Sequence, residues 1–390
     1  MTELRQTLTA TASEVTVDDI ERKLDDLLLR EQVEEAATLY KRARDMSLDL
    51  TFPQRLIHAL KRLGFDAEAH RLALEAPFPH DPAPWQVIHR AATLESIGAS
   101  ESAFELLDAA LAQFPKAAAL RTALAKQAFL AGKPLPKIVE LVRIATESAS
   151  PEAPVLNRIV ELLETGWTTV LGFTLRLPVD VVSPQVALAV MRGYYEHDER
   201  RAATGDLRPE DRVLELGCGI GLVSLEIARA QPLTQILCVE ANPALENATR
   251  ESFAANGCSA DLVGAVATLA DGETDFYLAR DFWESAAAPI SSPVSVIRRK
   301  SVDVNRLIKE FDPSIIVMDI EGGELDLIPK MVLDGLRRLV IEFHPANCQA
   351  DAISASIAHL LNSGFMLDLG AGSQQVLVFD RHSPPDSESA

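Results

Sequence analysis

The chain has 390 residues, of which 47% are apolar, and it carries a formal net charge of −20. This length allows two or three domains with sizeable cores, whereas the acidity argues against nucleic acid as the main partner, because such proteins cluster Lys and Arg. No apolar run reaches the roughly 18 residues that a membrane span needs.

The N-terminal segment and the cysteines indicate the cellular compartment. The first 19 residues have neither the basic start nor the apolar core of a secretory signal, and residues 1–15 are expected to be a disordered leader. None of the four cysteines forms a Cys-x-x-Cys pair or a zinc-like cluster with His. We therefore expect a cytoplasmic protein.

Residues 16–165 have helical periodicity throughout, beginning with the capped segment "TVDDIERKLDDLLLREQ". Gly64, Gly98 and Gly132 are each 34 residues apart. This period, with small residues where two helices touch, resembles tetratricopeptide repeats, most clearly over residues 84–115. An ordinary α-helical domain with a coincidental spacing is the alternative. Helical arrays present faces to partners, so we expect docking of a protein partner or self-association here.

After Gly166 strands alternate with helices. We expect strands at "RVLEL", "QILCVEANP", "SADLVGAVA", "PSIIVMDIE", "RRLVIEFHP", "MLDLG" and "QQVLVFDR", and helices at "LVSLEIARAQP", "ALENATRESFAANG", "GELDLIPKMVLDGL" and "ADAISASIAHLLNSGF". This alternation predicts an α/β doubly wound domain over residues 166–380. Residues 381–390 are rich in Pro and Ser and are expected to be a disordered tail.

A glycine-rich turn, Gly217-Cys218-Gly219-Ile220-Gly221, follows the first strand of this domain. Dinucleotide enzymes place their third glycine at i+5, whereas here it stands at i+4, which suits a ligand without a pyrophosphate. Glu240 ends the next strand, where a carboxylate accepts hydrogen bonds from ribose hydroxyls. These residues favour S-adenosylmethionine over NAD. A solvated charge at the end of a strand is the alternative for Glu240.

The segments "RVLELGCGIGLVSLEIA", "VEANP", "TLADGETDFYLA", "IIVMDIEGGELDLI" and "RRLVIEFHP" resemble the FkbM family of S-adenosylmethionine-dependent methyltransferases over residues 168–380. The resemblance implies a class I methyltransferase fold, Rossmann-like, with a seven-stranded sheet whose last strand is antiparallel. It also implies methyl transfer mostly to hydroxyl oxygens of sugars or secondary metabolites.

The resemblance also assigns cofactor contacts. Glu215 and the glycine-rich turn would hold the methionine part, Glu240 the ribose, and the loop around Ala265 the adenine. The expected cofactor set is Tyr195, Glu196, Glu215, Gly217, Cys218, Gly219, Gly221, Glu240, Ala241, Asn242, Ala265, Val266 and Asp319.

Ionisable residues gather after two strands that should be neighbours. Asp319 and Glu321 would point to one side if their strand persists, Glu324 falls in the first turn of the next helix, and Glu342 and His344 are again two residues apart. We expect Asp319 at the methyl site.

Roles follow for the other four groups. We expect His344 or Glu321 to act as the base that takes a proton from the acceptor, and Glu324 and Glu342 to orient the acceptor. A Mg²⁺ ion at Asp319 and Glu321 is a less favoured alternative. Structural alternatives are a helix-start charge at Glu324, a strand end at His344, and pairing of Glu342 with Arg337 or Arg338.

The sequence thus predicts a cytoplasmic S-adenosylmethionine-dependent O-methyltransferase that acts on a small-molecule or glycan acceptor. The main alternative is a non-catalytic scaffold whose α/β domain only binds S-adenosylmethionine or S-adenosylhomocysteine. The glycine spacing disfavours an NAD-dependent dehydrogenase. N- and C-methylation remain open.

Overall fold

The computed structural model describes residues 17–30, 32–45, 53–76, 82–279, 285–286, 295–344 and 350–381. The chain divides into two compact units, Met1–Asn157 and Arg158–Ala390. The expected leader and the expected tail beyond Arg381 lie outside the described residues.

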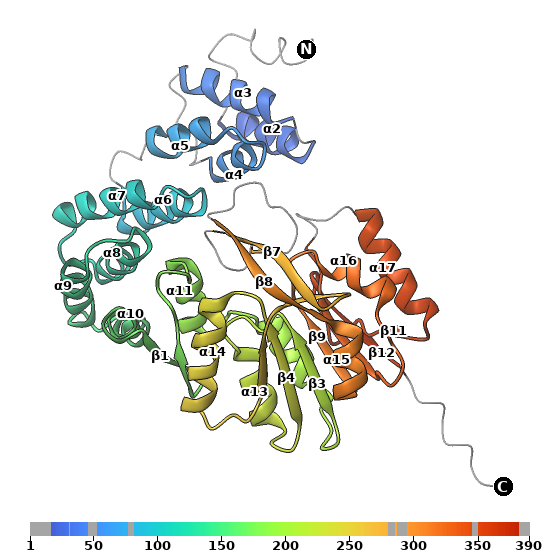
Figure 1. Ribbon diagram of the computed structural model, residues 1–390. Coiled ribbons are helices and arrows are strands. Elements are labelled where there is room, and N and C mark those ends of the chain that lie inside the picture. The colour runs from blue at the N-terminus through green and yellow to red at the C-terminus, as the bar shows by residue number, and fades with distance from the viewer. Residues whose placement is uncertain are drawn as a thin grey trace. The chain divides into compact units, whose positions relative to one another are not determined.

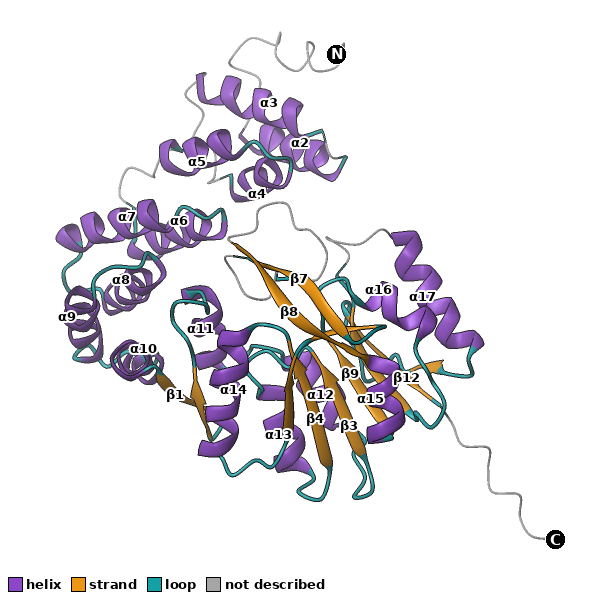
Figure 2. Ribbon diagram, in the orientation of Figure 1, coloured by secondary structure: helices purple, strands orange, loops and turns teal. Residues whose placement is uncertain are grey.

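The N-terminal unit is built from helices, drawn in purple in Figure 2. They are α2 (Val17–Leu29), α3 (Val33–Asp45), α4 (Gln54–Arg62), α5 (Asp66–Glu75), α6 (Pro84–Ser96), α7 (Ser100–Gln113), α8 (Ala118–Leu130) and α9 (Leu135–Thr146), followed by α10 (Ala153–Thr165), which crosses into the second unit. Sequential helices pack in pairs, α2 on α3, α4 on α5, α6 on α7 and α8 on α9.

The 34-residue recurrence falls on the turns inside these pairs. Gly64, Gly98 and Gly132 have φ angles of 79°, 81° and 62°, and an added Cβ would meet nothing within 4 Å at any of them. The left-handed backbone, and not a shortage of space, therefore calls for glycine at these turns. The assignment to tetratricopeptide repeats stays a prediction.

The C-terminal unit contains a seven-stranded sheet in the order β11-β12-β10-β9-β3-β4-β5 (Figure 1). The strands are β3 (Arg212–Leu216), β4 (Gln235–Glu240), β5 (Asp261–Gly264), β9 (Ile315–Met318), β10 (Arg338–Glu342), β11 (Met366–Leu367) and β12 (Val376–Asp380). From β5 to β10 every pair is parallel, whereas β12 is antiparallel to both of its neighbours. The expected α/β sheet with an antiparallel last strand is confirmed.

Helices and two smaller sheets complete this unit. The helices are α11 (Pro184–Arg192), α12 (His197–Thr204), α13 (Leu222–Ala230), α14 (Pro243–Ala255), α15 (Val304–Phe311), α16 (Glu324–Leu327) and α17 (Ala350–Asn362). The hairpin β1 (Trp167–Val170) and β2 (Phe173–Arg176) precedes the main sheet, and β6 (Val266–Thr268), β7 (Gly272–Leu278) and β8 (Ser295–Asp303) form a three-stranded sheet.

The sheet's centre is apolar on both faces, as parallel sheets require. All four residues of β9 are buried, and Leu214, Ile316 and Leu339 from three adjacent strands are fully inaccessible. The polar residues at the carboxyl ends of β3, β4, β9 and β10 therefore follow directly on a rigid core. Among the described residues, no helix has the length and apolarity to cross a membrane; the cytoplasmic location stays a prediction.

Three expectations about local structure were wrong. The helix expected over 323–336 ends at Leu327 and continues only as a 3-10 turn, Ile328–Lys330, because Pro329 has no N–H and its ring obstructs the preceding turn. The strand expected over 313–321 stops at Met318, and "SADLVGAVA" is split into β5 and β6 at Ala265. The β1–β2 hairpin and the strands β7 and β8 were not expected at all.

Candidate functional site

The glycine-rich turn lies at the carboxyl end of β3, pressed against the ends of both neighbouring strands. The backbone N–H groups of Gly217 and Cys218 both donate to the carbonyl of Val239, at 2.9 and 3.2 Å. Gly217 has a φ of 83°, and a Cβ there would lie 1.8 Å from the carbonyl oxygen of Asp319. Only glycine allows the turn to approach β9 this closely.

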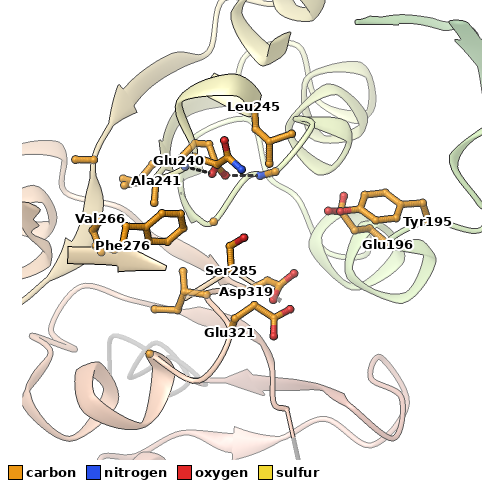
Figure 3. A pocket seen from close by; sticks show the side chains of 18 residues that line it. Tyr195, Glu196, Glu240, Ala241, Leu245, Val266, Phe276, Ser285, Asp319 and Glu321 are labelled. Atoms are coloured by element: carbon orange, nitrogen blue, oxygen red, sulfur yellow. Dashed lines mark hydrogen bonds between the residues drawn. The ribbon is translucent and has the colours of Figure 1, made fainter. Parts of the chain in front are cut away.

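Glu240 fixes the neighbouring loop. Its carboxylate accepts hydrogen bonds from the N–H of Gly219 at 2.9 Å and from the N–H of Asn242 at 2.6 Å, the contacts drawn as dashed lines in Figure 3. Burial raises the pKa of Glu240 to about 7, although these hydrogen bonds and the charge of Arg299 act in the opposite direction. A carboxylate that already holds two N–H donors is oriented for further donors from a ligand.

A first cavity opens at this edge of the sheet. Many of the residues expected to contact the cofactor line it: Tyr195, Glu196, Gly217, Gly219, Glu240, Ala241, Asn242, Ala265, Val266 and Asp319. Figure 3 shows Val266 and Phe276 on one side of the cavity, Tyr195 and Glu196 on another, and Asp319 and Glu321 between them. A carboxylate held by two N–H groups, apolar side chains and further acidic groups thus line one cavity.

Three residues of the expected cofactor set do not line the cavity: Glu215, Cys218 and Gly221. Glu215 is 2% exposed and accepts a hydrogen bond from the Ser224 hydroxyl; burial raises its pKa to about 8. Cys218 is fully buried. These residues contribute to the packing around the turn and not to the cavity lining.

Gly221 has a packing role as well. A Cβ at this position would lie 2.7 Å from both Thr249 and Phe253 on α14, and its φ is 78°. Glycine is therefore needed here for the close approach of the turn to α14, not for a contact with the cavity.

A second cavity adjoins the first. Its lining includes Tyr195, Glu196, Asp319 and Glu321, which also line the first cavity. The remaining lining residues are Tyr194, His197, Asp198, Glu199, Glu342, His344, Ser373, Gln375 and Val376. A group bound in one cavity can therefore meet a group bound in the other at Asp319 and Glu321.

The five ionisable groups expected at this rim come together around His344. Its Nε2 lies 3.4 Å from Asp319 Oδ1, 3.2 Å from Glu321 Oε1 and 4.0 Å from Glu342 Oε2, and its Nδ1 lies 3.7 Å from Glu324 Oε1. The strand ends at Met318, so the side chains of Asp319 and Glu321 converge through the turn that follows it, not through the alternation of a strand.

The structural alternatives for two of these groups can now be compared with the contacts. Arg337 pairs with Asp206 and Asp211, and Arg338 with Asp206 and Asp380, so neither is the partner of Glu342. Glu324 does begin α16, and its Oε1 accepts the N–H of Ile320 at 2.9 Å. It acts at the start of the short helix and also faces His344.

Burial and like charge shift these groups strongly. Burial, followed by Glu321, Glu196 and Glu324, raises the pKa of Asp319, and burial with the charge of Asp319 raises the pKa of Glu342 to about 9. Burial alone would lower the pKa of His344, but its hydrogen bond to Glu321 and the surrounding carboxylates outweigh that effect and raise it. Such shifts are typical of groups that exchange protons in a reaction.

Two of the residues shared by both cavities have an unfavourable backbone. Glu196 and Glu321 adopt φ angles of 49° and 54°, in the left-handed region. A residue with a Cβ pays about 1–2 kcal/mol for this conformation, and such strain concentrates at functional sites. The turn after β9 therefore holds the Glu321 carboxylate toward His344 against the intrinsic preference of its own backbone.

Sequence reasoning missed part of both linings. Phe276 on β7 and Ser285 line the first cavity, and Glu199 on α12 lines the second with only 8% of its surface exposed. Phe276 lies in the segment "TLADGETDFYLA" that carries the family resemblance, but no strand had been predicted there. For Ser285 the sequence carried no signal. For Glu199 the signal was its place, three residues after Glu196, in the acidic segment "YYEHDE".

Residues 221–370 match the family model described as "Methyltransferase FkbM domain". The match covers less than half of the chain and confirms the expected resemblance over that segment only. In Klebsiella pneumoniae, a 23S rRNA (uracil(1939)-C(5))-methyltransferase, RlmD, is 37% identical over 111 residues, which are 28% of this chain and 24% of that protein. The chain thus spans about a quarter of the length of the curated relatives that it matches.

Solved structures give weaker likenesses. A methyltransferase from Pyrococcus furiosus is 10% identical, with 60% of this chain and 98% of that chain covered and a TM-score of 0.33. TYW2 of M. jannaschii in complex with AdoMet is 13% identical, with 55% and 86% covered and a TM-score of 0.32.

Proposed function

We propose that the C-terminal unit is an S-adenosylmethionine-dependent methyltransferase. The cofactor would lie in the first cavity, with its ribose hydroxyls on Glu240 and its adenine beside Val266 and Phe276. The match of residues 221–370 to a methyltransferase domain supports this class of reaction. The observation that carries the proposal is the sharing of Asp319 and Glu321 by two adjoining cavities, because methyl transfer needs donor and acceptor to meet at one point.

The chemistry expected at that point is an in-line displacement. The acceptor oxygen attacks the methyl group, the bond from sulfur to methyl breaks, and neutral S-adenosylhomocysteine leaves. Asp319 would face the sulfonium, whose positive charge offsets the crowded carboxylates. A hydroxyl is a weak nucleophile near neutral pH, so removal of its proton by His344 or Glu321 assists the attack, while Glu324 and Glu342 hold the acceptor side in place.

The acceptor we propose is a sugar or another polyhydroxylated molecule, methylated on oxygen. Among the described residues, the second cavity is lined by six carboxylates, Glu196, Asp198, Glu199, Asp319, Glu321 and Glu342, and by no Lys or Arg. Hydroxyl groups donate hydrogen bonds to carboxylates, whereas phosphates are repelled by them. The Klebsiella pneumoniae relative is named as a 23S rRNA methyltransferase, but an acidic cavity on a chain of net charge −20 is a poor surface for an RNA backbone.

The binding test is calorimetry of the full chain with S-adenosylmethionine and with NAD. We expect micromolar binding of S-adenosylmethionine and no heat with NAD. Micromolar NAD binding without S-adenosylmethionine binding would overturn the proposal.

The transfer test uses a deuterated methyl donor with separated glycan, small-molecule and RNA fractions of a cell extract. We expect label in the glycan or small-molecule fraction, and a loss of at least about a hundredfold in Asp319→Asn. Asp351→Asn, on the exposed side of α17, is the matched control and should retain wild-type rates. Label confined to RNA would refute the proposed acceptor, and binding without any transfer would favour the scaffold alternative.

For the N-terminal unit we propose docking to a protein partner or self-association. Paired helices of this kind bury one face against their neighbours and leave another available. Trp85, at the start of α6, is 66% exposed. Light scattering of the full chain tests self-association: a monomer at micromolar concentration that co-purifies with no partner would contradict both roles.

A further inference from the structure

The group around His344 has more negative partners than one imidazole can satisfy. Three carboxylates lie within 4.0 Å of its Nε2, yet a ring nitrogen carries at most one hydrogen to donate. No Lys or Arg among the described residues forms an ion pair with Asp319, Glu321, Glu324 or Glu342. Asp319 Oδ1 is buried without a hydrogen-bond partner although it points at this group.

The arrangement has the spacing of a metal site. Asp319, Glu321 and His344 each offer one ligand atom, and these three atoms lie within 4.8 Å of one another. Ligands about 2.0–2.2 Å from a common ion are separated by up to about 4.4 Å, so small side-chain adjustments bring all three onto one cation.

The contacts of His344 Nδ1, on the other side of the imidazole, support the metal site independently. Glu324 has only 1% of its side chain exposed, its Oε2 has no hydrogen-bond partner, and its Oε1 lies 3.7 Å from His344 Nδ1, which is itself buried without a partner. A histidine that binds a metal through one nitrogen usually donates from the other to a carboxylate, which orients the ring. Glu324 stands where that outer carboxylate is required.

We propose that Asp319, Glu321 and His344 bind one divalent cation, with Glu324 orienting the imidazole. One imidazole and two carboxylates suit a first-row ion such as Mn²⁺ better than Ca²⁺, which takes oxygen ligands only. Three protein ligands leave coordination positions open, as in catalytic sites. Because Asp319 and Glu321 line both cavities, the open positions are available to an acceptor in the second cavity.

The catalytic consequence, unlike the binding, rests on the proposed methyl transfer. A cation at this point holds the acceptor oxygen and lowers the pKa of its hydroxyl. The O–H bond then breaks, its proton passes to solvent in the second cavity, and the oxygen takes the methyl group as the bond to sulfur breaks. His344 and Glu321 then serve as ligands, and the cation activates the hydroxyl in place of a protein base.

The test is titration of MnCl₂ into the metal-free full chain, with the free ion followed by its paramagnetic resonance signal. We expect one Mn²⁺ per chain in the wild type and at least tenfold weaker binding in His344→Ala and Glu321→Gln. Glu324→Gln should weaken binding about tenfold or more through the ring orientation. His359→Ala, on α17 and outside the group, is the matched control and should bind as the wild type does. Thermal melting shows that each variant is folded.

The result that overturns the inference is no uptake by the wild type at millimolar MnCl₂, or equal affinity in folded Glu321→Gln. Calorimetry with S-adenosylmethionine on the same samples separates the two proposals. Cofactor binding without Mn²⁺ uptake would refute the metal site and leave the proposed methyltransferase function intact. Mn²⁺ uptake without cofactor binding would refute the methyltransferase function and leave the metal site intact.

Discussion

Gly217→Ala tests whether the glycine-rich turn is pressed against the end of β9. An L-residue at the positive φ of this position costs about 1–2 kcal/mol. In addition, the new Cβ would lie 1.8 Å from the Asp319 carbonyl oxygen and 2.8 Å from its carbon, which are backbone atoms and cannot rotate away. Overpacking of this kind adds about 1–3 kcal/mol.

Gly257→Ala is the matched control, because Gly257 also has a positive φ, of 63°, but an added Cβ there meets nothing within 4 Å. The difference between the two variants therefore isolates the clash. With a shift of about 2–4 °C per kcal/mol for a unit of this size, Gly217→Ala should melt about 2–12 °C below Gly257→Ala. Because the clash displaces Asp319, S-adenosylmethionine affinity should fall in Gly217→Ala alone. Circular-dichroism melts and calorimetry measure both effects. Equal melting temperatures in the two variants would show that the turn does not need this close approach.

Two further predictions concern the acidic residues. Burial raises the pKa of Glu240 to about 7, and ribose hydroxyls need its charged form as acceptor. The affinity for S-adenosylmethionine should therefore be constant above pH 7 and fall by up to about tenfold per pH unit below it. Calorimetry across pH 5.5–8.5 should find this pH dependence in the wild type and not in Glu240→Gln; an equal dependence in both would show that another group causes it. Glu321→Gly should raise stability by about 0.5–1 kcal/mol, because relief of the left-handed strain exceeds the entropy cost of glycine, while methyl transfer is lost. Asp312→Gly is the control: it relieves the same strain, at a φ of 49°, and should stabilise the fold without affecting methyl transfer. A lower melting temperature for Glu321→Gly alone would mean that the side-chain contacts of Glu321 stabilise the fold by more than its backbone strain destabilises it.

The sequence by itself predicts the parts of the structure that depend on interactions between residues close in the chain. An apolar run predicts strand β3, glycines at i, i+2 and i+4 predict the turn after it, and an amphipathic segment predicts α13. Strand β3 has the bounds expected for it. The alternation of such units also predicted a mainly parallel sheet, and in a parallel sheet the carboxyl ends of neighbouring strands meet at one edge. The sequence therefore predicts that Asp319, Glu321, Glu342 and His344 lie together.

The tertiary structure decided how these groups meet. Glu199 on α12 and Glu196 at the N-cap of this helix reach the site from more than a hundred residues before Glu342 in the chain. No local pattern shows which distant helix covers a sheet edge. Likewise, the alternation of a strand did not bring Glu321 to His344. Pro329 cuts the following helix short, and a left-handed residue in the turn redirects the side chain, because sidedness in a turn depends on the contacts that enforce its backbone angles.

The same division applies to the glycines. The family resemblance implied that Gly217, Gly219 and Gly221 all contact the cofactor. Packing separates them: Gly217 and Gly219 line the first cavity, whereas Gly221 faces Thr249 and Phe253 of α14. A sequence shows that the backbone must come close to something at each glycine. Whether that neighbour is a ligand or another part of the chain depends on contacts between segments far apart in the sequence, and these exist only in the folded protein.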